Sequence, residues 1–304
     1  MKINRRWTHS GKNRDPLEGI PFVVREVPLA DKDRGATGRR NSIKKGEAQK
    51  FWAPESWSQI AVEILATKYA RLEGIPREIL SSYVTKIENE VTSEEKERLL
   101  NSGREFHARM IFERLAGCWR EWGEERGYFD GIADAQAFED ECLYMLAKQM
   151  GSPNSPQWFN TGIYSHYGLK GPPQGHYYWD PSKQQVASST SAYERPQPHA
   201  CFIQSVSDDL ISPGGIMELW LKEARLFKYG SGSGTNFSNI REQGGPLSGG
   251  GVSSGLMSFL KVGDTAAGAI RSGGKTRRAA KMVCLDADHP DIEEFVGWKS
   301  KEER

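Results

Sequence analysis

The sequence has few cysteines and no long hydrophobic run, and each of these absences excludes a class of protein. Its 304 residues include four cysteines, none in a CxxC pair, which disfavours a structural zinc cluster. No stretch approaches the roughly 18 apolar residues of a membrane span, and the basic N terminus lacks the apolar segment of a secretory signal. We therefore expect a soluble cytoplasmic protein, in which any functional cysteine serves redox or radical chemistry rather than a structural disulfide.

The chain as a whole is nearly neutral, but its first 50 residues are strongly basic. The net charge is +1, yet residues 1–50 carry 13 Lys or Arg against 6 Asp or Glu. Such a basic arm could contact nucleic acid, or could be a solvated extension. No helix-turn-helix, zinc finger or aromatic platform supports DNA binding. We predict that residues 1–53 form a basic, poorly structured N-terminal arm.

Helical periodicity begins near Pro54. Ser56 and Gln59 have the spacing of a capping box, and apolar residues then recur at helical intervals. The same period predicts helices over Phe106–Trp122 and Asp134–Met150. Residues 54–150 are thus expected to be a helical domain. The following 151–193 are rich in proline and glycine, which predicts a connecting region without regular structure, although its aromatic residues indicate packing.

Strand and helix patterns alternate in the remainder. We predict strands over 200–206 and 280–285, with helices over Ile216–Phe227, Ser254–Ile270 and from about Asp288 onward. This order indicates an α/β fold with parallel pairing. Two or three parallel strands do not make a closed sheet, so the α/β part, within 151–304, is expected to be incomplete in this chain.

Two glycine-rich segments could contact a ligand. The run GSGSGTN, flanked by segments suited to packed structure, favours a fixed backbone cradle over a flexible linker. The segment RSGGKTRRAAK ends like a phosphate-binding P-loop but has Ala269 where that motif needs glycine, which argues against a Walker-type site. Lys275, Arg277 and Arg278 could still grip a phosphorylated ligand, or form a merely solvated turn.

The cysteines differ in their surroundings. Cys118 and Cys142 lie on apolar helical faces, and Cys284 lies in a strand, so we expect all three in the core. Cys201 stands between a loop and the acidic pair Asp208-Asp209, and either packing or function is open for it. The histidines show no metal-ligand spacing, and we predict no metal site.

Taken together, these segments resemble the adenosylcobalamin-dependent (class II) ribonucleotide reductases. The resemblance covers nearly all of the chain from about Pro54 onward, and its matches keep their order. They are WSQIAVEILATKYAR, RLAGCWREWG, SPNSPQWFNTG, GPPQGHYY, AYERPQPHACFIQSVSDDL, LFKYGSGSGTNFSNIR, PLSGGGVSSGLMSFLK and AGAIRSGGKTRRAAKMVCLDADHPDIEEFVGWK.

The resemblance implies a fold and a set of site residues. The fold would be an N-terminal helical domain followed by the first part of a ten-stranded α/β barrel. Cys201 would be one of the two redox cysteines that reduce the ribose. The other residues implied are, for substrate, Ser155, Ala200 (through its backbone), Ser231 and Gly232, and for a deoxynucleoside triphosphate effector, Asp208, Arg241, Lys275, Arg277 and Arg278.

The resemblance also implies what the chain works with. The complete enzyme would use adenosylcobalamin, a ribonucleotide substrate, a dNTP effector and a thioredoxin-type reductant, and would form a homodimer. The family's radical cysteine and second redox cysteine would fall outside this sequence, so we expect this chain to need the C-terminal half of the reductase and to be inactive alone. Two other classes stay open: a catalytically inactive nucleotide-binding or regulatory protein, and a nucleic-acid-associated protein acting through the basic arm.

Overall fold

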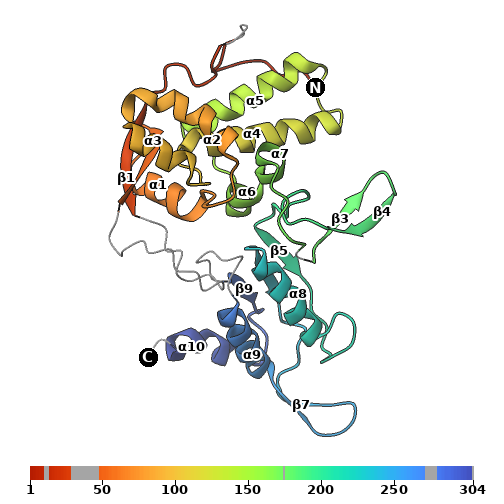
Figure 1. Cartoon of the computed structure of the whole chain (residues 1–304). Helices are drawn as coiled ribbons and strands as arrows, with labels where there is room; N and C mark the ends of the chain where they lie inside the picture. Colours follow the sequence, from red (N-terminus) through yellow and green to blue (C-terminus); the bar gives the residue numbers. More distant parts are fainter. Residues whose placement is uncertain (10–13, 29–47, 174, 271–278, 303–304) are drawn as a thin grey trace. The chain divides into compact units, whose positions relative to one another are not determined.

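The structure is a computed structural model that describes residues 1–9, 14–28, 48–173, 175–270 and 279–302 (Figure 1). Its described residues divide into two compact units, with the boundary between Pro198 and His199. None of the described helices is both long and apolar enough to cross a bilayer.

The first unit is mainly helical, with two small antiparallel hairpins. A turn of π-helix (Leu65–Tyr69) continues its first helix, and a 3₁₀ segment (Thr85–Glu90) follows its second. Its elements are β1 (Phe22–Pro28), β2 (Ala48–Pro54), α1 (Gln59–Ile64), α2 (Arg77–Val84), α3 (Ser93–Leu100), α4 (Ala108–Glu125), α5 (Ile132–Ala147), α6 (Ser155–Asn160), α7 (Ile163–Tyr167), β3 (Tyr177–Asp180) and β4 (Gln185–Ser188).

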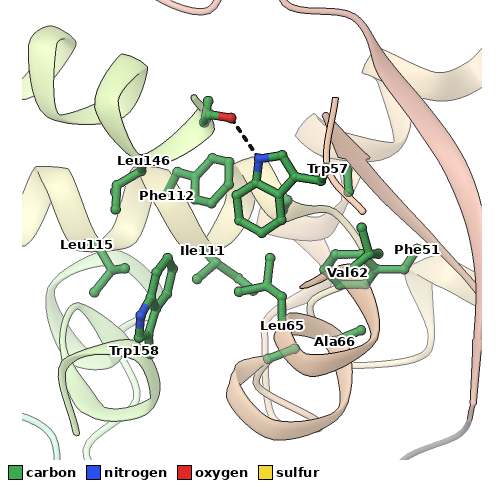
Figure 2. Packing of buried hydrophobic residues seen from close by; sticks show 14 of the residues in the cluster. Phe51, Trp57, Val62, Leu65, Ala66, Ile111, Phe112, Leu115, Leu146 and Trp158 are labelled. Atoms are coloured by element: carbon green, nitrogen blue, oxygen red, sulfur yellow. Dashed lines mark hydrogen bonds between the residues drawn. The ribbon is translucent and has the colours of Figure 1, made fainter. Parts of the chain in front are cut away.

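Helix α4 forms the centre of this unit. Its apolar residues Ile111, Phe112 and Leu115 are fully buried in one cluster, against residues of β2, α1, α5 and α6 (Figure 2). The indole of Trp57 donates a hydrogen bond to the carbonyl of Ala147, 2.7 Å away, so this buried donor is satisfied. The predicted helices over 106–122 and 134–150 are confirmed as α4 and α5.

A buried ion pair fixes α4 to the chain that follows it. Arg114 and Glu105 are both fully buried and lie 2.6 Å apart, and Arg114 also donates to the carbonyls of Trp158 and Thr161. Gly162 adopts a left-handed conformation (φ 78°), and a Cβ there would lie 2.0 Å from the Arg114 carbonyl oxygen. Only glycine fits this close approach.

The first unit differs from the sequence prediction at both ends. Residues 1–53 were predicted to be a poorly structured arm, but in the described part β1 pairs with β2 and buries Phe51 and Trp52. The strands are only seven residues each and show no regular alternation of apolar and polar residues, so their sequence shows no clear strand signal beside the basic composition. Likewise 151–193 contains α6, α7 and the β3–β4 hairpin, because Trp158 and Tyr167 are buried despite the prolines and glycines around them.

The second unit is a small α/β arrangement. Its elements are β5 (Cys201–Gln204), α8 (Ile216–Lys228), β6 (Gly232–Asn236), β7 (Gln243–Pro246), β8 (Val252–Ser254), α9 (Leu256–Ala269), β9 (Lys281–Cys284) and α10 (Ile292–Glu302). Strands β5, β6 and β9 form one parallel sheet with β6 in the middle, and β7 and β8 form a separate hairpin. The predicted parallel α/β pattern, its two strands and its three helices are confirmed.

One prediction in this unit was wrong. The glycine-rich run was expected to be a turn that forms a fixed backbone cradle, but Gly232–Asn236 is the central strand of the sheet. Glycine is depleted in strands, so the composition concealed the strand. Its surroundings explain the glycines: a Cβ on Gly234 would meet the ends of the Ile203 and Met282 side chains at 3.0 Å each.

Candidate functional site

The β5–β6–β9 sheet presents two faces of different character. Register pairs Cys201 with Gly232 and Gly234 with Met282, so these residues share one face. On that face Cys201, Ile203, Met282 and Cys284 are exposed. The opposite face carries Ser233, Thr235 and Lys281 and packs against α8 and the cluster around Leu219 and Trp220. One face of a parallel sheet is therefore open among the described residues.

Cys201 begins β5 on this open face, as a free and exposed thiol. The residue beside it on the central strand is Gly232. A Cβ on Gly232 would lie 3.5 Å from the Cys201 sulfur and 3.0 Å from the Ala280 carbonyl oxygen. The absence of a side chain at Gly232 thus leaves the sulfur uncovered on the side of the sheet, where a second molecule could approach it.

Two hydrogen bonds hold the chain before Cys201 against β6. The Gly232 amide donates to the carbonyl of Ala200, 2.5 Å away, and the Ser231 hydroxyl donates to the carbonyl of His199 at 2.6 Å. Ser231 is buried, while Ala200 is half-buried. The structure therefore brings together four residues predicted from the sequence: Cys201, Ala200, Ser231 and Gly232.

A buried ion pair supports the other face of the sheet, and sequence reasoning missed it. Lys281 lies 2.8 Å from one carboxylate oxygen of Glu223, and the Ser233 hydroxyl donates to the other at 2.7 Å. The Lys281 ammonium also sits 3.6 Å from the centre of the Trp220 ring. Burial lowers the pKa of Lys281, against the opposing effect of Glu223. Because these residues come from α8, β6 and β9, no local sequence signal joins them.

A second predicted pair lies beyond the end of β5. The Arg241 Nε and an Asp208 carboxylate oxygen are 2.6 Å apart, and Arg241 Nη1 donates to the Pro246 carbonyl at 2.5 Å. Both side chains are about one-third exposed, at 33% and 29%. Arg241 Nη2 makes no hydrogen bond to any residue that the structure describes. The predicted Lys275, Arg277 and Arg278 lie outside the described residues.

Ser155 belongs to the first unit. It is the first residue of α6, whose N-cap is Asn154, and its hydroxyl lies 2.9 Å from the Tyr69 hydroxyl. Ser155 and Cys201 therefore belong to different units.

The remaining cysteines divide into two kinds. Cys118 and Cys142 pack in the first unit, as predicted, and burial raises the pKa of each thiol to about 11. Cys284 was predicted to lie in the core, but it is exposed. It is the last residue of β9 and lies on the open face. Its apolar neighbours Met282 and Leu285 suggested a buried strand, but only the opposite face of this strand is buried. Over the described ranges, no three His, Cys, Asp or Glu side chains are grouped to hold a metal ion.

Comparisons with known proteins match both units. The profile described as class II vitamin B12-dependent ribonucleotide reductase matches residues 42–149, and the ribonucleotide reductase barrel-domain profile matches 199–304. Proteins named vitamin B12-dependent ribonucleotide reductase are 52% identical in Bradyrhizobium diazoefficiens and 56% identical in Agrobacterium fabrum. Each match covers 100% of this chain and 24% of the relative, so the chain spans about a quarter of their length.

A more distant relative carries the same name as the first two. A vitamin B12-dependent ribonucleotide reductase of Rhodopirellula baltica is 40% identical over 96% of this chain and 24% of its own length. The class Id ribonucleotide reductase alpha subunit of Actinobacillus ureae is a solved structure that matches at 20% identity with a TM-score of 0.37, over 61% of this chain and 26% of that one. On the profiles and the sequence identities, the chain belongs to the class II vitamin B12-dependent ribonucleotide reductase family.

Proposed function

We propose that this chain contributes a redox thiol, Cys201, to a ribonucleotide reductase that converts ribonucleotides to 2′-deoxyribonucleotides. The observation that carries the proposal is the position of the thiol: an exposed sulfur at the start of a strand, uncovered because Gly232 has no side chain. Family membership supplies the class of reaction, and the open face of the sheet supplies access for a substrate.

The proposed step balances without a further oxidant. The Cys201 thiol and a second thiol, supplied by the part of the relatives that this chain does not span, form a disulfide and release two electrons and two protons. The substrate takes these up as its 2′-hydroxyl leaves as water and a C–H bond replaces it. Thiol–disulfide exchange with a thioredoxin-type reductant would then restore both thiols.

The same proposal places the substrate around the sheet. The ribose would lie near Ser231 and Gly232, where the backbone of Ala200 also approaches. The open sheet would become part of a ten-stranded barrel in the whole enzyme, since parallel strands are normally covered on both faces.

Adenosylcobalamin would supply the radical chemistry, as the names of the relatives suggest. The corrin ring of that cofactor holds the cobalt through its own nitrogens, so the protein need not supply a cluster of metal ligands. The part of the relatives that this chain does not span would hold most of it. No residue of this chain is therefore assigned to cobalamin.

The role of the Cys201 thiol can be tested by comparing substitutions of two cysteines on the same sheet. The chain, completed with the remaining segment of a relative, would be assayed for deoxynucleotide formation with adenosylcobalamin and a dithiol. We expect Cys201→Ser to abolish multiple-turnover reduction. Cys284→Ser, the matched control on the same exposed face, should retain it. Normal turnover by Cys201→Ser would overturn the assignment of Cys201, whereas no turnover by the completed wild type would favour a nucleotide-binding protein without this chemistry.

We further propose that Asp208 and Arg241 hold a deoxynucleoside triphosphate effector. Their ion pair is part-exposed, and Arg241 Nη2 is free to bond a phosphate or sugar oxygen. Arg241→Ala in the completed enzyme should weaken effector binding and blur the choice of substrate base, while basal reduction continues. Lys222→Ala, which removes an exposed cation from α8, is the control. Loss of basal activity with an intact effector response would instead place Arg241 at the substrate.

A further inference from the structure

A cavity in the first unit lies apart from every residue assigned above. It has a volume of about 460 Å³ and lies between β2, α3 and the chain that leads from Arg104 to Phe106. Sites for small organic ligands usually measure roughly 300–1,000 Å³. Its lining is mixed, with apolar side chains such as Leu72, Val91 and Leu99 beside charged ones. Size and lining both suit a small organic molecule.

The charges around the cavity are unbalanced. Three cations line it, Lys50, Arg98 and Arg104, against the single carboxylate of Glu95. Glu95 is already committed, because Lys50 lies 2.6 Å from it and the Thr92 backbone donates to it at 3.0 Å. Three positive charges less one negative leave an excess of two among the lining residues, with the carboxylate of Glu90 nearby, which accepts a hydrogen bond from the Trp52 indole at 2.7 Å.

The two arginines have no acceptor of their own. Within the part of the chain that the structure describes, neither the Arg98 nor the Arg104 guanidinium forms a hydrogen bond or an ion pair. Burial and, as the smaller effect, the positive charge of Arg98 together lower the pKa of Arg104 to about 10. Two guanidinium groups held near each other, one of them half-buried, form an environment that a doubly charged anion would stabilise.

We propose that this cavity binds an organic phosphate, with the phosphate on Arg98 and Arg104 and the organic group on the apolar lining. A phosphate monoester carries a charge near −2 at neutral pH, which equals the excess positive charge of the lining. Guanidinium forks bond phosphate oxygens in pairs. The apolar side requires more than inorganic phosphate, and the volume admits a molecule of about the size of a nucleoside monophosphate.

The test measures binding of AMP, adenosine and inorganic phosphate to the whole chain by calorimetry. We expect AMP to bind saturably and more tightly than inorganic phosphate, and adenosine not to bind. Arg98→Gln and Arg104→Gln should each weaken AMP binding on the order of tenfold or more, since each removes charge-assisted hydrogen bonds. Both variants should melt at or above the wild-type temperature, because each removes one of two like charges.

Two controls separate this site from any other. Lys96→Gln removes an exposed cation from the same helix as Arg98, without altering the cavity lining, and should bind AMP within about twofold of the wild type, as long-range charge effects at the surface are screened. Arg241→Ala should also leave AMP binding unchanged, which keeps this proposal independent of the effector site. Absence of saturable AMP binding, equal binding of phosphate and AMP, or an equal loss in Lys96→Gln would each overturn the proposal.

Discussion

Cys118 and Cys142 lie against the helical core, where burial raises the pKa of each thiol to about 11, whereas Cys201 and Cys284 are exposed at the two ends of a sheet face. A thiol reacts as its thiolate, so the two buried cysteines are poor nucleophiles at neutral pH. The difference in reactivity arises from the surroundings of each residue, and it makes cysteine labelling a direct probe of the open face.

His107 shows the same dependence on surroundings in a structural role. Its ring is buried against Phe22, and its Nδ1 accepts a hydrogen bond from the Arg109 amide at the start of α4. Burial, together with the positive charges of Arg109 and Lys86, lowers its pKa to about 3. Since an accepting Nδ1 carries no proton, protonation would both remove this helix cap and bury a charge.

We predict that His107 makes the first unit acid-sensitive. The pKa in the folded state lies below the unfolded value near 6.5, so its stabilising contribution is complete above that value and is lost as the pH falls toward 3. Between pH 7.5 and pH 5.5 this loss is about 1.4 kcal/mol in the free energy of unfolding. His107→Asn keeps a capping acceptor and should remove most of this dependence, as measured by urea unfolding at the two pH values.

His9→Asn provides the control for this measurement. His9 is exposed, so the variant should keep the wild-type dependence on pH. If His107→Asn lost stability between pH 7.5 and 5.5 as steeply as the wild type, another group would be responsible for the effect.

Helix α9 packs closely on α8 through a glycine. A Cβ on Gly263 would lie 2.6 Å from the Trp220 ring and 2.9 Å from the Lys281 ammonium, whereas a Cβ on Gly268 in the same helix would meet nothing within 4 Å. Gly263→Ala must therefore displace the Trp220 ring or the buried ammonium. Gly268→Ala changes only the helix itself.

We predict opposite effects for these two substitutions. Gly263→Ala should lower the free energy of unfolding by about 1–3 kcal/mol through overpacking. Gly268→Ala should raise it by up to about 1 kcal/mol through helix propensity. Urea unfolding followed by tryptophan fluorescence measures both. A stabilising Gly263→Ala would mean that α9 does not approach Trp220 this closely.

The elements that could be predicted from the sequence are those with a long, regular pattern. Helices α4, α5, α8 and α9 bury one face at helical spacing, and the sequence shows that spacing directly. The strand β6 could not be predicted, because GSGTN has no side-chain alternation. Its place depends on Ile203 and Met282, which stand on neighbouring strands distant in sequence.

The candidate site divides in the same way. Two short motifs, which a family resemblance can match, contain Cys201, Ala200, Ser231 and Gly232. The parallel pairing of β5 with β6 then brings these residues together. The buried contact of Lys281 with Glu223 joins residues 58 positions apart and follows no motif. Cys284 was misplaced because an apolar strand gives no indication of which face is covered.

At the scale of the whole molecule, the main feature of the second unit is the open face of its sheet. Ile203 and Met282 are 79% and 54% exposed there, next to the two exposed cysteines. Parallel sheets are normally covered on both faces, and exposed apolar faces and strand edges favour association. The chain also spans only 24% of the length of its relatives, and we propose that their remaining sequence, as a separate polypeptide, covers this face.

We predict that the isolated chain has no reductase activity, tends to aggregate, and binds that remaining polypeptide through this face. Co-expression should give a stable complex on size-exclusion chromatography, and turnover should appear with adenosylcobalamin and a dithiol. Iodoacetamide should label Cys201 and Cys284 quickly in the isolated chain and slowly in the complex, because the face is then covered.

Two substitutions test whether the sheet face itself makes the contact. Met282→Glu places a charge on the open face, so it should reduce aggregation of the isolated chain but prevent the complex, since a buried unpaired carboxylate costs several kcal/mol. Val186→Glu places the same charge on β4 of the first unit, where Val186 is 64% exposed, and should leave the complex intact. If Met282→Glu formed the complex as well as the wild type, or if the labelling rate of Cys284 were the same in both states, the sheet face would not be the contact surface. An isolated chain that turned over nucleotide by itself would contradict the need for a partner, because the second thiol would then have to come from within these residues.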